Sequence, residues 1–307
     1  MKRLAAVNRP DLGNQRFWRW RGWQMRYTYI LPDDPTARQQ TPMLLVHGFG
    51  ASLEQWRSNL RTWGQRRPVY AVDLLGFGHS QKAAVLLGAD VWQMQVYEFW
   101  RLVIGQPVIL LGHSLGALVA LTAAAHHADM VQRLILLTLP LAREELVAGW
   151  VDRLSRRVEG LFATPLLLRP LFALVRRPSF IRGALTKIYQ DPDRVNQELV
   201  ELFTRPTLER GAARTLCYLV KSRTRSDFSE VTADLIGQVS VPVLLLWGSQ
   251  DRILPLAWAR QILAMNPKID YREIDGAGHC LYDEVPTVLD NVLQAWLRET
   301  AGRPFVG

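Results

Sequence analysis

The sequence predicts an α/β protein in which a mostly parallel β-sheet is flanked by helices. Short apolar runs of strand length alternate with longer helical patterns before residue 140, and the alternation resumes after residue 240. One apolar strand, residues 108–111, leads through Gly-His-Ser-Leu-Gly at 112–116 into an Ala-rich helix. This strand, turn and helix place Ser114 on a tight turn with its hydroxyl above the sheet, and the other informative segments are interpreted around it.

The first half of the chain predicts a β-hairpin followed by alternating strands and helices. Residues 17–21 and 23–31, split by Gly22, alternate aromatic with basic or polar side chains, as antiparallel strands with one wet face do. The elements expected next are a strand at 43–46, a helix at 53–64, a strand at 69–74, a helix at 91–104, the strand before Ser114 and a strand at 134–139. This order favours a parallel sheet with helices on both faces.

Residues 141–240 break this alternation. They contain apolar clusters interrupted by Pro and by pairs of Arg, which predicts several short helices with packing of their own. The earlier pattern then resumes with strands at 242–247 and 271–274 and a closing helix at 285–297.

Composition sets broad limits on the class of protein. A chain of 307 residues with 49% hydrophobic and 21% charged residues is typical of a globular fold that holds one large domain or a core with an insertion. The two cysteines provide no disulfide framework and suit a reducing compartment. Because no apolar run reaches signal-peptide or transmembrane length, we expect a cytoplasmic protein, with peripheral contact to a membrane left open.

The net charge of +9 is concentrated in residues 1–30 and 141–190. Two interpretations stay open: a solvated basic surface, or attraction to an anionic membrane surface or an acidic partner. Nucleic acid is not an expected partner, because no nucleic-acid-binding motif accompanies the charge. The sequence does not indicate the oligomeric state.

Ser114 requires a base and an acid that orients the base, because a serine hydroxyl is a weak nucleophile at neutral pH. Of the six histidines, His279 follows a strand and a Gly-rich turn, so it is expected at the same edge of the sheet as Ser114. His113 must point away from Ser114 on so tight a turn. The other histidines are interpreted as structural: His47, His79, His126 and His127.

The orienting acid should lie on the same edge, between Ser114 and His279 in chain order. Asp251 meets this requirement, since it is the first acid after the strand at 242–247 and its turn. Asp275 is the alternative, but it lies only four residues before His279 and is expected to fix the turn instead.

A negatively charged intermediate would need hydrogen-bond donors that already point at it. By position these are the backbone N–H groups of Leu115, directly after Ser114, and of Phe49, in the loop after the strand at 43–46. Gly48 and Gly50 allow this loop to approach the site closely.

Five motifs together resemble the α/β-hydrolase superfamily, in the branch with a helical cap after the sixth strand. They are His47-Gly48-Phe49-Gly50, Asp73-x-x-Gly76-x-Gly78-x-Ser80, Gly112-His113-Ser114-Leu115-Gly116, Gly248-x-x-Asp251 and Gly278-His279. The resemblance implies an eight-stranded sheet in which only the second strand is antiparallel. It divides the chain into a core of residues 1–140 and 241–307 and a cap of residues 141–240. It also implies a catalytic triad of Ser114, Asp251 and His279.

Segments at 18–22, 48–52 and 73–78 are similar to hydrolases of cyanobacteria and chloroplasts, including pheophytinase-like and chlorophyll-dephytylating members. Haloalkane dehalogenases and epoxide hydrolases resemble the chain too, but they carry Asp at the position of Ser114.

The predicted function is hydrolysis of a carboxylic ester of a lipophilic small molecule through an acyl-enzyme, with no cofactor and no metal. Three alternatives stay open: hydrolysis or lysis of a thioester or C–C bond, removal of phytol from a chlorophyll-type substrate, and ligand binding without catalysis.

The apolar residues of the inserted segment either pack against the main domain or line an acyl or isoprenoid cavity. They are Leu161, Phe162, Leu166, Leu167, Leu168, Leu171, Phe172 and Leu174. In the second case Arg169, Arg176, Arg177 and Arg182 would hold this segment near an anionic bilayer.

Overall fold

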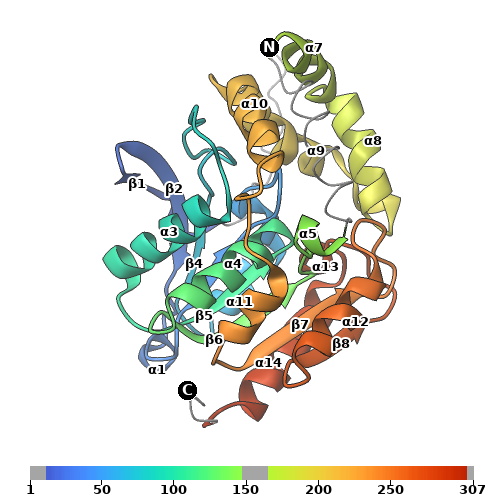
Figure 1. Cartoon of the computed structure of the whole chain (residues 1–307). Helices are drawn as coiled ribbons and strands as arrows, with labels where there is room; N and C mark the ends of the chain where they lie inside the picture. The colour runs from blue at the N-terminus through green and yellow to red at the C-terminus, as the bar shows by residue number, and fades with distance from the viewer. Residues whose placement is uncertain (1–11, 147–164, 303–307) are drawn as a thin grey trace.

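A single β-sheet forms the centre of the molecule (Figure 1). The computed structural model describes residues 12–146 and 165–302. Within these residues the sheet has eight strands: β1 Arg16–Trp20, β2 Trp23–Ile30, β3 Met43–Val46, β4 Val69–Val72, β5 Val108–His113, β6 Val131–Leu137, β7 Val243–Gly248 and β8 Asp270–Ile274.

The strand order is β1-β2-β4-β3-β5-β6-β7-β8. β2 pairs antiparallel with both β1 and β4, whereas every pairing from β4 to β8 is parallel. The expected mostly parallel sheet with one antiparallel second strand is therefore confirmed. Parallel strands bring their carboxyl ends to one edge, so β3, β5, β7 and β8 deliver the loops that follow them to the same place.

Helices cover both faces of this sheet. Their bounds are α1 Pro35–Arg38, η1 Leu53–Ser58, α2 Leu60–Gly64, α3 Ala89–Phe99, η2 Trp100–Ile104, α4 Leu115–His126, α11 Thr232–Gln238, α12 Leu256–Met265, α13 Leu281–Glu284 and α14 Pro286–Glu299. The helix expected at 53–64 is thus a 3₁₀ segment followed by a short α-helix. The helix expected at 91–104 ends in a π-helical turn.

Two hydrophobic clusters lie between the sheet and its layers of helices, because successive residues of a strand point to opposite faces. In β3, Leu44 and Val46 belong to the cluster that includes α3, α4 and α12. Met43 and Leu45 belong to the cluster that includes η1, α2 and α14. Each fully buried side chain of this kind stabilises the fold by about 2 kcal/mol.

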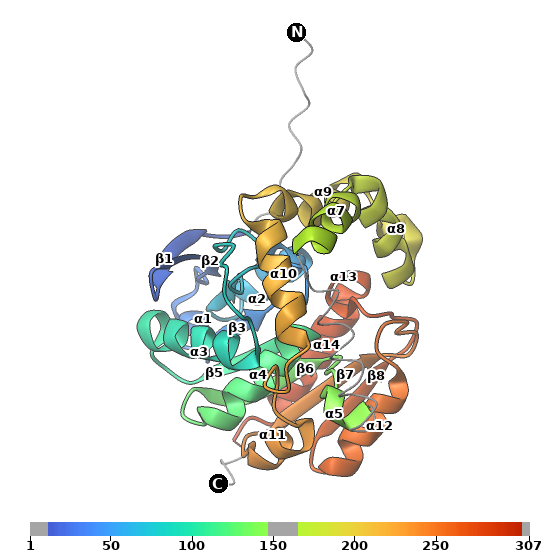
Figure 2. The same ribbon diagram turned by 45° about the horizontal axis from the view of Figure 1, so that its top comes forward.

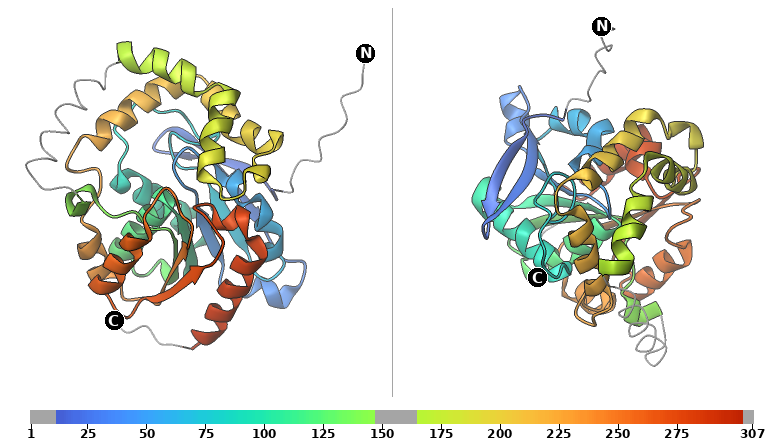
Figure 3. Two further views of the ribbon diagram at one scale, coloured as in Figure 1. Left: turned by 90° about the vertical axis from the view of Figure 1, so that its right-hand side faces the viewer. Right: turned by 90° about the horizontal axis from the view of Figure 1, so that it is seen from above.

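Residues 165–223, which we call the cap, lie over one end of the sheet (Figures 1 and 2). The cap consists of α7 Pro165–Val175, α8 Pro178–Ile188, η3 Pro192–Arg194, α9 Gln197–Thr204, η4 Arg205–Leu208 and α10 Ala212–Arg223. The short helix α5 Arg143–Leu146 precedes it. α7 packs on α10 and α8 packs on α9, in the arch at the top of Figure 3, left.

The helix α11 also falls in the span expected for the inserted segment, yet it packs against α4 and α12 of the sheet layers. Leu235 and Ile236 of α11 are buried in the same cluster as α4. No helix within residues 12–146 and 165–302 is long and apolar enough to cross a membrane.

Several hydrogen bonds and ion pairs tie the cap to the core. The Tyr189 hydroxyl, after α8, donates a hydrogen bond to Asp283 Oδ2 at 2.8 Å. The Glu209 carboxylate, after η4, lies 2.9 Å from Lys82 Nζ and accepts a hydrogen bond from the His79 ring. The middle part of the cap is therefore joined to α13 and to the loop after β4.

Candidate functional site

Ser114 stands on a strained turn between β5 and α4. Its φ is 52° and its ψ is −118°, a backbone conformation that L-residues rarely adopt and that costs about 1–3 kcal/mol. The neighbouring glycines explain how the turn fits. A Cβ on Gly112 would lie 2.1 Å from the carbonyl oxygen of Gly116, and a Cβ on Gly116 would lie 2.2 Å from that of Val46. The Ser114 hydroxyl is thus presented at the carboxyl edge of the sheet.

His279 and Asp251 are hydrogen-bonded partners at the same edge. His279 Nδ1 donates to Asp251 Oδ2 at 2.8 Å, and both side chains are buried. The second carboxylate oxygen of Asp251 accepts from the backbone N–H groups of Ile253 at 2.7 Å and Leu254 at 2.9 Å. Because Nδ1 carries the donated proton, the lone pair of His279 lies on Nε2, where it can accept a proton.

Asp275, the alternative acid, has a different role. Its carboxylate accepts hydrogen bonds from the Ser249 hydroxyl at 3.2 Å and from the N–H of Gly276 at 2.9 Å. These contacts close the turn between β8 and His279, so the geometry favours Asp251 over Asp275 as the partner of His279.

His113 connects the turn at Ser114 with His279. His113 Nε2 donates a hydrogen bond to the carbonyl oxygen of His279 at 3.0 Å, and the two ring centroids are 4.8 Å apart. Burial, reinforced by the neighbouring His279, lowers the pKa of His113 well below its usual range. The described residues contain no hydrogen bond between the Ser114 hydroxyl and the His279 imidazole. The His279 side chain is therefore hydrogen-bonded to Asp251, and the His279 backbone is linked to the Ser114 turn by His113.

Glu284 is a positioning residue that the sequence analysis missed. Its buried carboxylate accepts hydrogen bonds from the N–H groups of Gly278 at 3.2 Å and Cys280 at 3.0 Å, on either side of His279. A Cβ on Gly278 would approach Glu284 Oε1 to 2.9 Å, so a side chain at this position would displace the carboxylate. The only sequence signal for this role is a pair of acids, Asp283 and Glu284, four and five residues after the histidine.

The loop after β3 supplies backbone donors near Ser114. Leu115 is the first residue of α4, and neither its N–H nor that of Phe49 has an acceptor among the described residues. The loop itself is held in place, because Gly48 donates its N–H to Gln55 Oε1 at 3.1 Å and accepts at its carbonyl from His47 Nδ1 at 2.8 Å. Free N–H groups at a helix start favour a negative charge.

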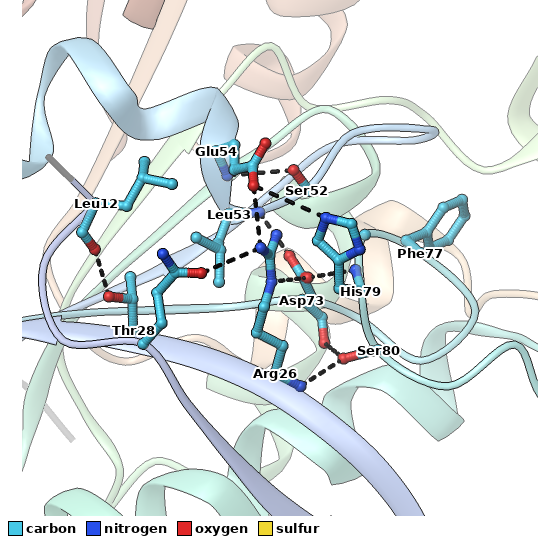
Figure 4. Close-up of polar contacts among 12 residues, drawn as sticks. Leu12, Arg26, Thr28, Ser52, Leu53, Glu54, Asp73, Phe77, His79 and Ser80 are labelled. Atoms are coloured by element: carbon cyan, nitrogen blue, oxygen red, sulfur yellow. Dashed lines mark hydrogen bonds and ion pairs between the residues drawn. The ribbon is translucent and has the colours of Figure 1, made fainter. Parts of the chain in front are cut away.

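A buried ion-pair network lies next to the loop that follows β3 (Figure 4). Arg26 Nε lies 2.6 Å from Asp73 Oδ2, and Arg26 NH1 lies 3.0 Å from Glu54 Oε1. Arg26 was expected on the wet face of the hairpin, so that expectation is wrong for this residue. The side chain is buried because two carboxylates neutralise it, one from η1 and one from the turn after β4.

Asp73 organises the turn that follows β4. Its carboxylate accepts hydrogen bonds from the N–H groups of Leu53 at 2.6 Å and His79 at 2.7 Å. Burial alone would raise the pKa of Asp73, but the ion pair and hydrogen bond with Arg26, together with the hydrogen bond from the Leu53 N–H, hold that pKa below its usual value. The turn then places the Phe77 ring 5.5 Å from the Phe49 ring, so Asp73 fixes the position of the loop beside Ser114.

The remaining histidines make structural contacts. His47 Nε2 accepts from the N–H of Leu74 at 3.0 Å. His126 pairs with Glu230, and His127 stacks on Tyr97 with ring centroids 3.6 Å apart.

A cavity of about 480 Å³ opens directly on Ser114. Its lining is mostly apolar: Phe49, Leu115, Leu118, Pro140, Leu141, Leu146, Phe228, Ile253, Leu254 and Trp258, with Ser114, Ser229, Arg143 and Arg223 as the polar members. The residues of the inserted segment expected to line an acyl cavity are absent from this described lining. Leu168, Leu171, Phe172 and Leu174 lie on α7 instead. Leu161 and Phe162, and the side chains of Leu166 and Leu167, lie outside the described residues.

Cys280, next to His279, is a buried free thiol, and Cys217 in α10 is buried as well. Among the described residues, no group of three or more His, Cys, Asp or Glu side chains is placed to hold a metal ion.

Sheet topology, nucleophile-type turn and the His279–Asp251 pair together define an α/β-hydrolase. A family model described as alpha/beta hydrolase fold matches residues 41–286, so the chain belongs to this family.

Known proteins of several activities resemble the chain. It is 26% identical to the chloroplast pheophytinase of Arabidopsis thaliana over 86% of its own length, and it spans 62% of that relative. It is 28% identical to epoxide hydrolase 3 of Xenopus tropicalis, with 96% of this chain and 81% of the relative covered. Among solved structures, a bacterial membrane phospholipase A superposes with a TM-score of 0.72 at 22% identity, over 94% of this chain and 87% of the other.

Proposed function

We propose that this hydrolase is a serine esterase that cleaves a carboxylic ester of a lipophilic small molecule. One observation carries the proposal: Ser114 projects from a strained turn into an apolar cavity, at the sheet edge where His279 is paired with Asp251. A serine hydroxyl needs such a base, and the base needs such an acid.

The mechanism follows from the position of the proton on His279, which is on Nδ1 and leaves Nε2 free to accept a proton. His279 Nε2 removes the proton of Ser114 as its oxygen attacks the ester carbonyl, and Asp251 stabilises the imidazolium that forms. The tetrahedral oxyanion is held by the backbone N–H groups of Phe49 and Leu115. His279 returns the proton to the leaving alcohol, and a water activated by His279 then releases the acid. The hydrogen bond between Ser114 and His279 forms on substrate binding, as catalytic hydrogen bonds often do.

The cavity supports a lipophilic substrate, since aliphatic and aromatic side chains make up most of its wall. The relatives range from a pheophytinase to an epoxide hydrolase, so their names do not select the bond that is cleaved. Two other reactions would use the same Ser114, His279 and Asp251. They are cleavage of a thioester or C–C bond, and removal of phytol from a chlorophyll-type ester. A ligand-binding protein without catalysis is the alternative outside enzymes.

A fluorophosphonate probe and a series of p-nitrophenyl esters test the proposal. We expect covalent labelling of the native chain, faster turnover of long-chain than of acetyl esters, and loss of both signals in Ser114→Ala. Ser229→Ala is the matched control, because Ser229 lines the same cavity away from the turn. Equal activity of Ser114→Ala and the native chain would remove Ser114 from the mechanism, and no labelling together with no turnover would favour the ligand-binding alternative.

A further inference from the structure

A second groove, of about 490 Å³, lies on the cap. α7 and the residue after it form one wall through Arg169, Phe172 and Arg176, and residues 207–214 form the other wall. The second wall comprises the end of η4 and the first turn of α10, and it adds Arg210 and Arg214. Phe172, which is only 9% exposed, belongs to the wall formed by α7. Four guanidinium groups thus surround one groove that is separate from the cavity at Ser114.

The arginines of this groove have no counterion in the described structure. Arg169, Arg176, Arg210 and Arg214 make no ion pair or side-chain hydrogen bond with any described residue. Glu209 is the acid in the lining, and its carboxylate is already engaged by Lys82 and by His79. Four exposed cations in one concave site repel one another, and an anion that enters the groove relieves that repulsion.

Arginine and the start of α10 both suit a phosphate group. A guanidinium donates two parallel hydrogen bonds to phosphate oxygens. The first turn of α10 lines the groove, its N-cap Gly211 provides no side-chain acceptor, and the N–H groups of Ala213 and Arg214 have no acceptor among the described residues. These N–H groups add further donors to the arginine side chains.

Large apolar side chains are exposed on the cap, and one of them lines the groove itself. Leu208, which lines the groove, is 61% exposed, and Leu171 on α7 is 51% exposed. Leu174 on the same helix and Phe180 on α8 are also exposed. Residues 165–223 contain eleven Lys and Arg against five Asp and Glu, so the cap is strongly basic. A soluble phosphate compound would not require exposed leucines, whereas a bilayer surface presents phosphate and apolar chains together.

We propose that the groove binds the phosphate of an anionic phospholipid headgroup and docks the cap on a membrane surface, with Leu208 inserted at the headgroup boundary. Arg182 does not take part, because it donates hydrogen bonds to the Val195 carbonyl at 2.6 Å and to Gln197 at 3.0 Å within the cap. The inference is independent of the proposed esterase activity.

Flotation of the full chain with vesicles tests this docking. Vesicles of phosphatidylcholine alone are compared with vesicles that also contain phosphatidylglycerol, and with vesicles given the same surface charge by oleate, a carboxylate. We expect binding to the phosphatidylglycerol vesicles that weakens with salt. The double variant Arg169→Gln/Arg214→Gln should bind roughly 25-fold more weakly, since each basic residue near an anionic surface contributes about a fivefold factor.

The matched control removes the same charge elsewhere. Arg101 on η2 and Arg298 on α14 are exposed and lie outside the cap, and α14 is at the end of the molecule opposite to α7 (Figure 1). Arg101→Gln/Arg298→Gln should bind within about twofold of the native chain, because charges beyond the Debye length are screened. The variant Leu208→Ser should bind severalfold more weakly while it keeps all its arginines.

Several results would overturn the inference. Equal loss of binding in the control and in the groove variant would show a general charge effect, and preference for oleate over phosphatidylglycerol would exclude phosphate recognition. Unchanged binding of the leucine variant, with inorganic phosphate as an effective competitor, would assign the groove to a soluble anion. Arginine-dependent binding of single-stranded DNA in place of vesicles would assign it to nucleic acid. Ser114→Ala should bind vesicles like the native chain, so loss of esterase activity and loss of docking are separate outcomes.

Discussion

His113 Nε2 donates a hydrogen bond of 3.0 Å to the carbonyl oxygen of His279. The residue before Ser114 therefore holds the backbone of the proposed base, His279. Ser114 and His279 come from distant segments of the chain, and this hydrogen bond connects the two segments. Gly48 is also required here, since a Cβ at that position would lie 2.8 Å from His113 Nδ1.

His113→Ala is expected to lower kcat at least about tenfold and to change KM less than about twofold, because it frees the His279 backbone without touching the cavity. Steady-state ester hydrolysis measures the split, and His113→Asn, which keeps an N–H donor, should recover part of the rate. His127→Gln is the control, as His127 contacts Gln93 and Tyr97. A His113→Ala enzyme with native kcat would contradict a positioning role.

Replacement of the two candidate acids separates their roles. Asp251→Asn should reduce kcat by roughly 10³- to 10⁴-fold, because the amide no longer orients or stabilises the charged form of His279. Asp275→Asn should retain most of the activity, since it alters only the turn at Ser249 and Gly276. Comparable losses in both variants would show that the assignment of the acid to Asp251 is wrong.

Gly116→Ala is expected to destabilise the protein by about 3 kcal/mol, because the new methyl group would overlap the carbonyl oxygens of Val46 and His47. Gly183→Ala in α8 provides the contrast. Its Cβ would meet nothing within 4 Å, so the substitution should be neutral or stabilise by up to about 1 kcal/mol. Urea unfolding of both variants gives the two free energies, and similar values would show that the turn at Ser114 can relax.

Asp73→Asn should lower the free energy of unfolding by about 3 kcal/mol, because it leaves the buried Arg26 with Glu54 as its remaining carboxylate. The exposed pair Arg225–Asp227 offers a matched test, and Asp227→Asn should change stability little. Thermal unfolding monitored by circular dichroism compares them. If Asp73→Asn were as stable as the native chain, the network behind the Phe49 loop would contribute no stability.

Two buried histidines predict how stability depends on pH. Burial lowers the pKa of His47, and it lowers the pKa of His113 further, so both are neutral in the folded protein. Below the unfolded pKa of about 6.5 the unfolded chain binds more protons, so the free energy of unfolding is fully present above that pH and decreases as the pH falls. His113→Asn should reduce this slope by up to one proton between about pH 6.5 and 5. An unchanged slope would contradict the neutral state of His113.

The acid limit has the opposite origin. The pKa of Asp73 lies below its unfolded value of about 3.9, so its contribution is present above that value and is lost only as the pH falls through the lower, folded pKa. The histidine effect therefore begins near pH 6.5 and the Asp73 effect only below about pH 3.9, so unfolding curves collected from pH 7 downward should show the histidine effect first.

Local patterns were sufficient to predict the sheet and the placement of Ser114. Strand periodicity and the Gly-x-Ser-x-Gly turn depend on neighbouring residues, so a sequence displays them directly. Asp251 and His279 were also inferred, because each follows a strand whose carboxyl end must reach the same edge.

Contacts between distant segments could not be read in the same way. Arg26 alternates with aromatic residues as a solvent-facing side chain would, and only the tertiary fold brings Asp73 and Glu54 to it. The link from His113 to His279 spans 166 residues and has no sequence periodicity. The groove of arginines likewise depends on α7 lying beside α10, which hydrophobic patterning does not specify.

The buried thiols give the protein two internal reporters of local opening. Burial raises the pKa of Cys280 to about 12, and it also raises the pKa of Cys217, so neither sulfur is a reactive thiolate in the closed structure. Cys280 directly follows His279 in the chain, and Cys217 lies in α10 of the cap. Alkylation rates at the two positions therefore measure the exposure of the two regions separately. A serine-directed inhibitor can accordingly be studied in the presence of thiol reagents, and the alkylation rate of each cysteine then reports how often its region opens.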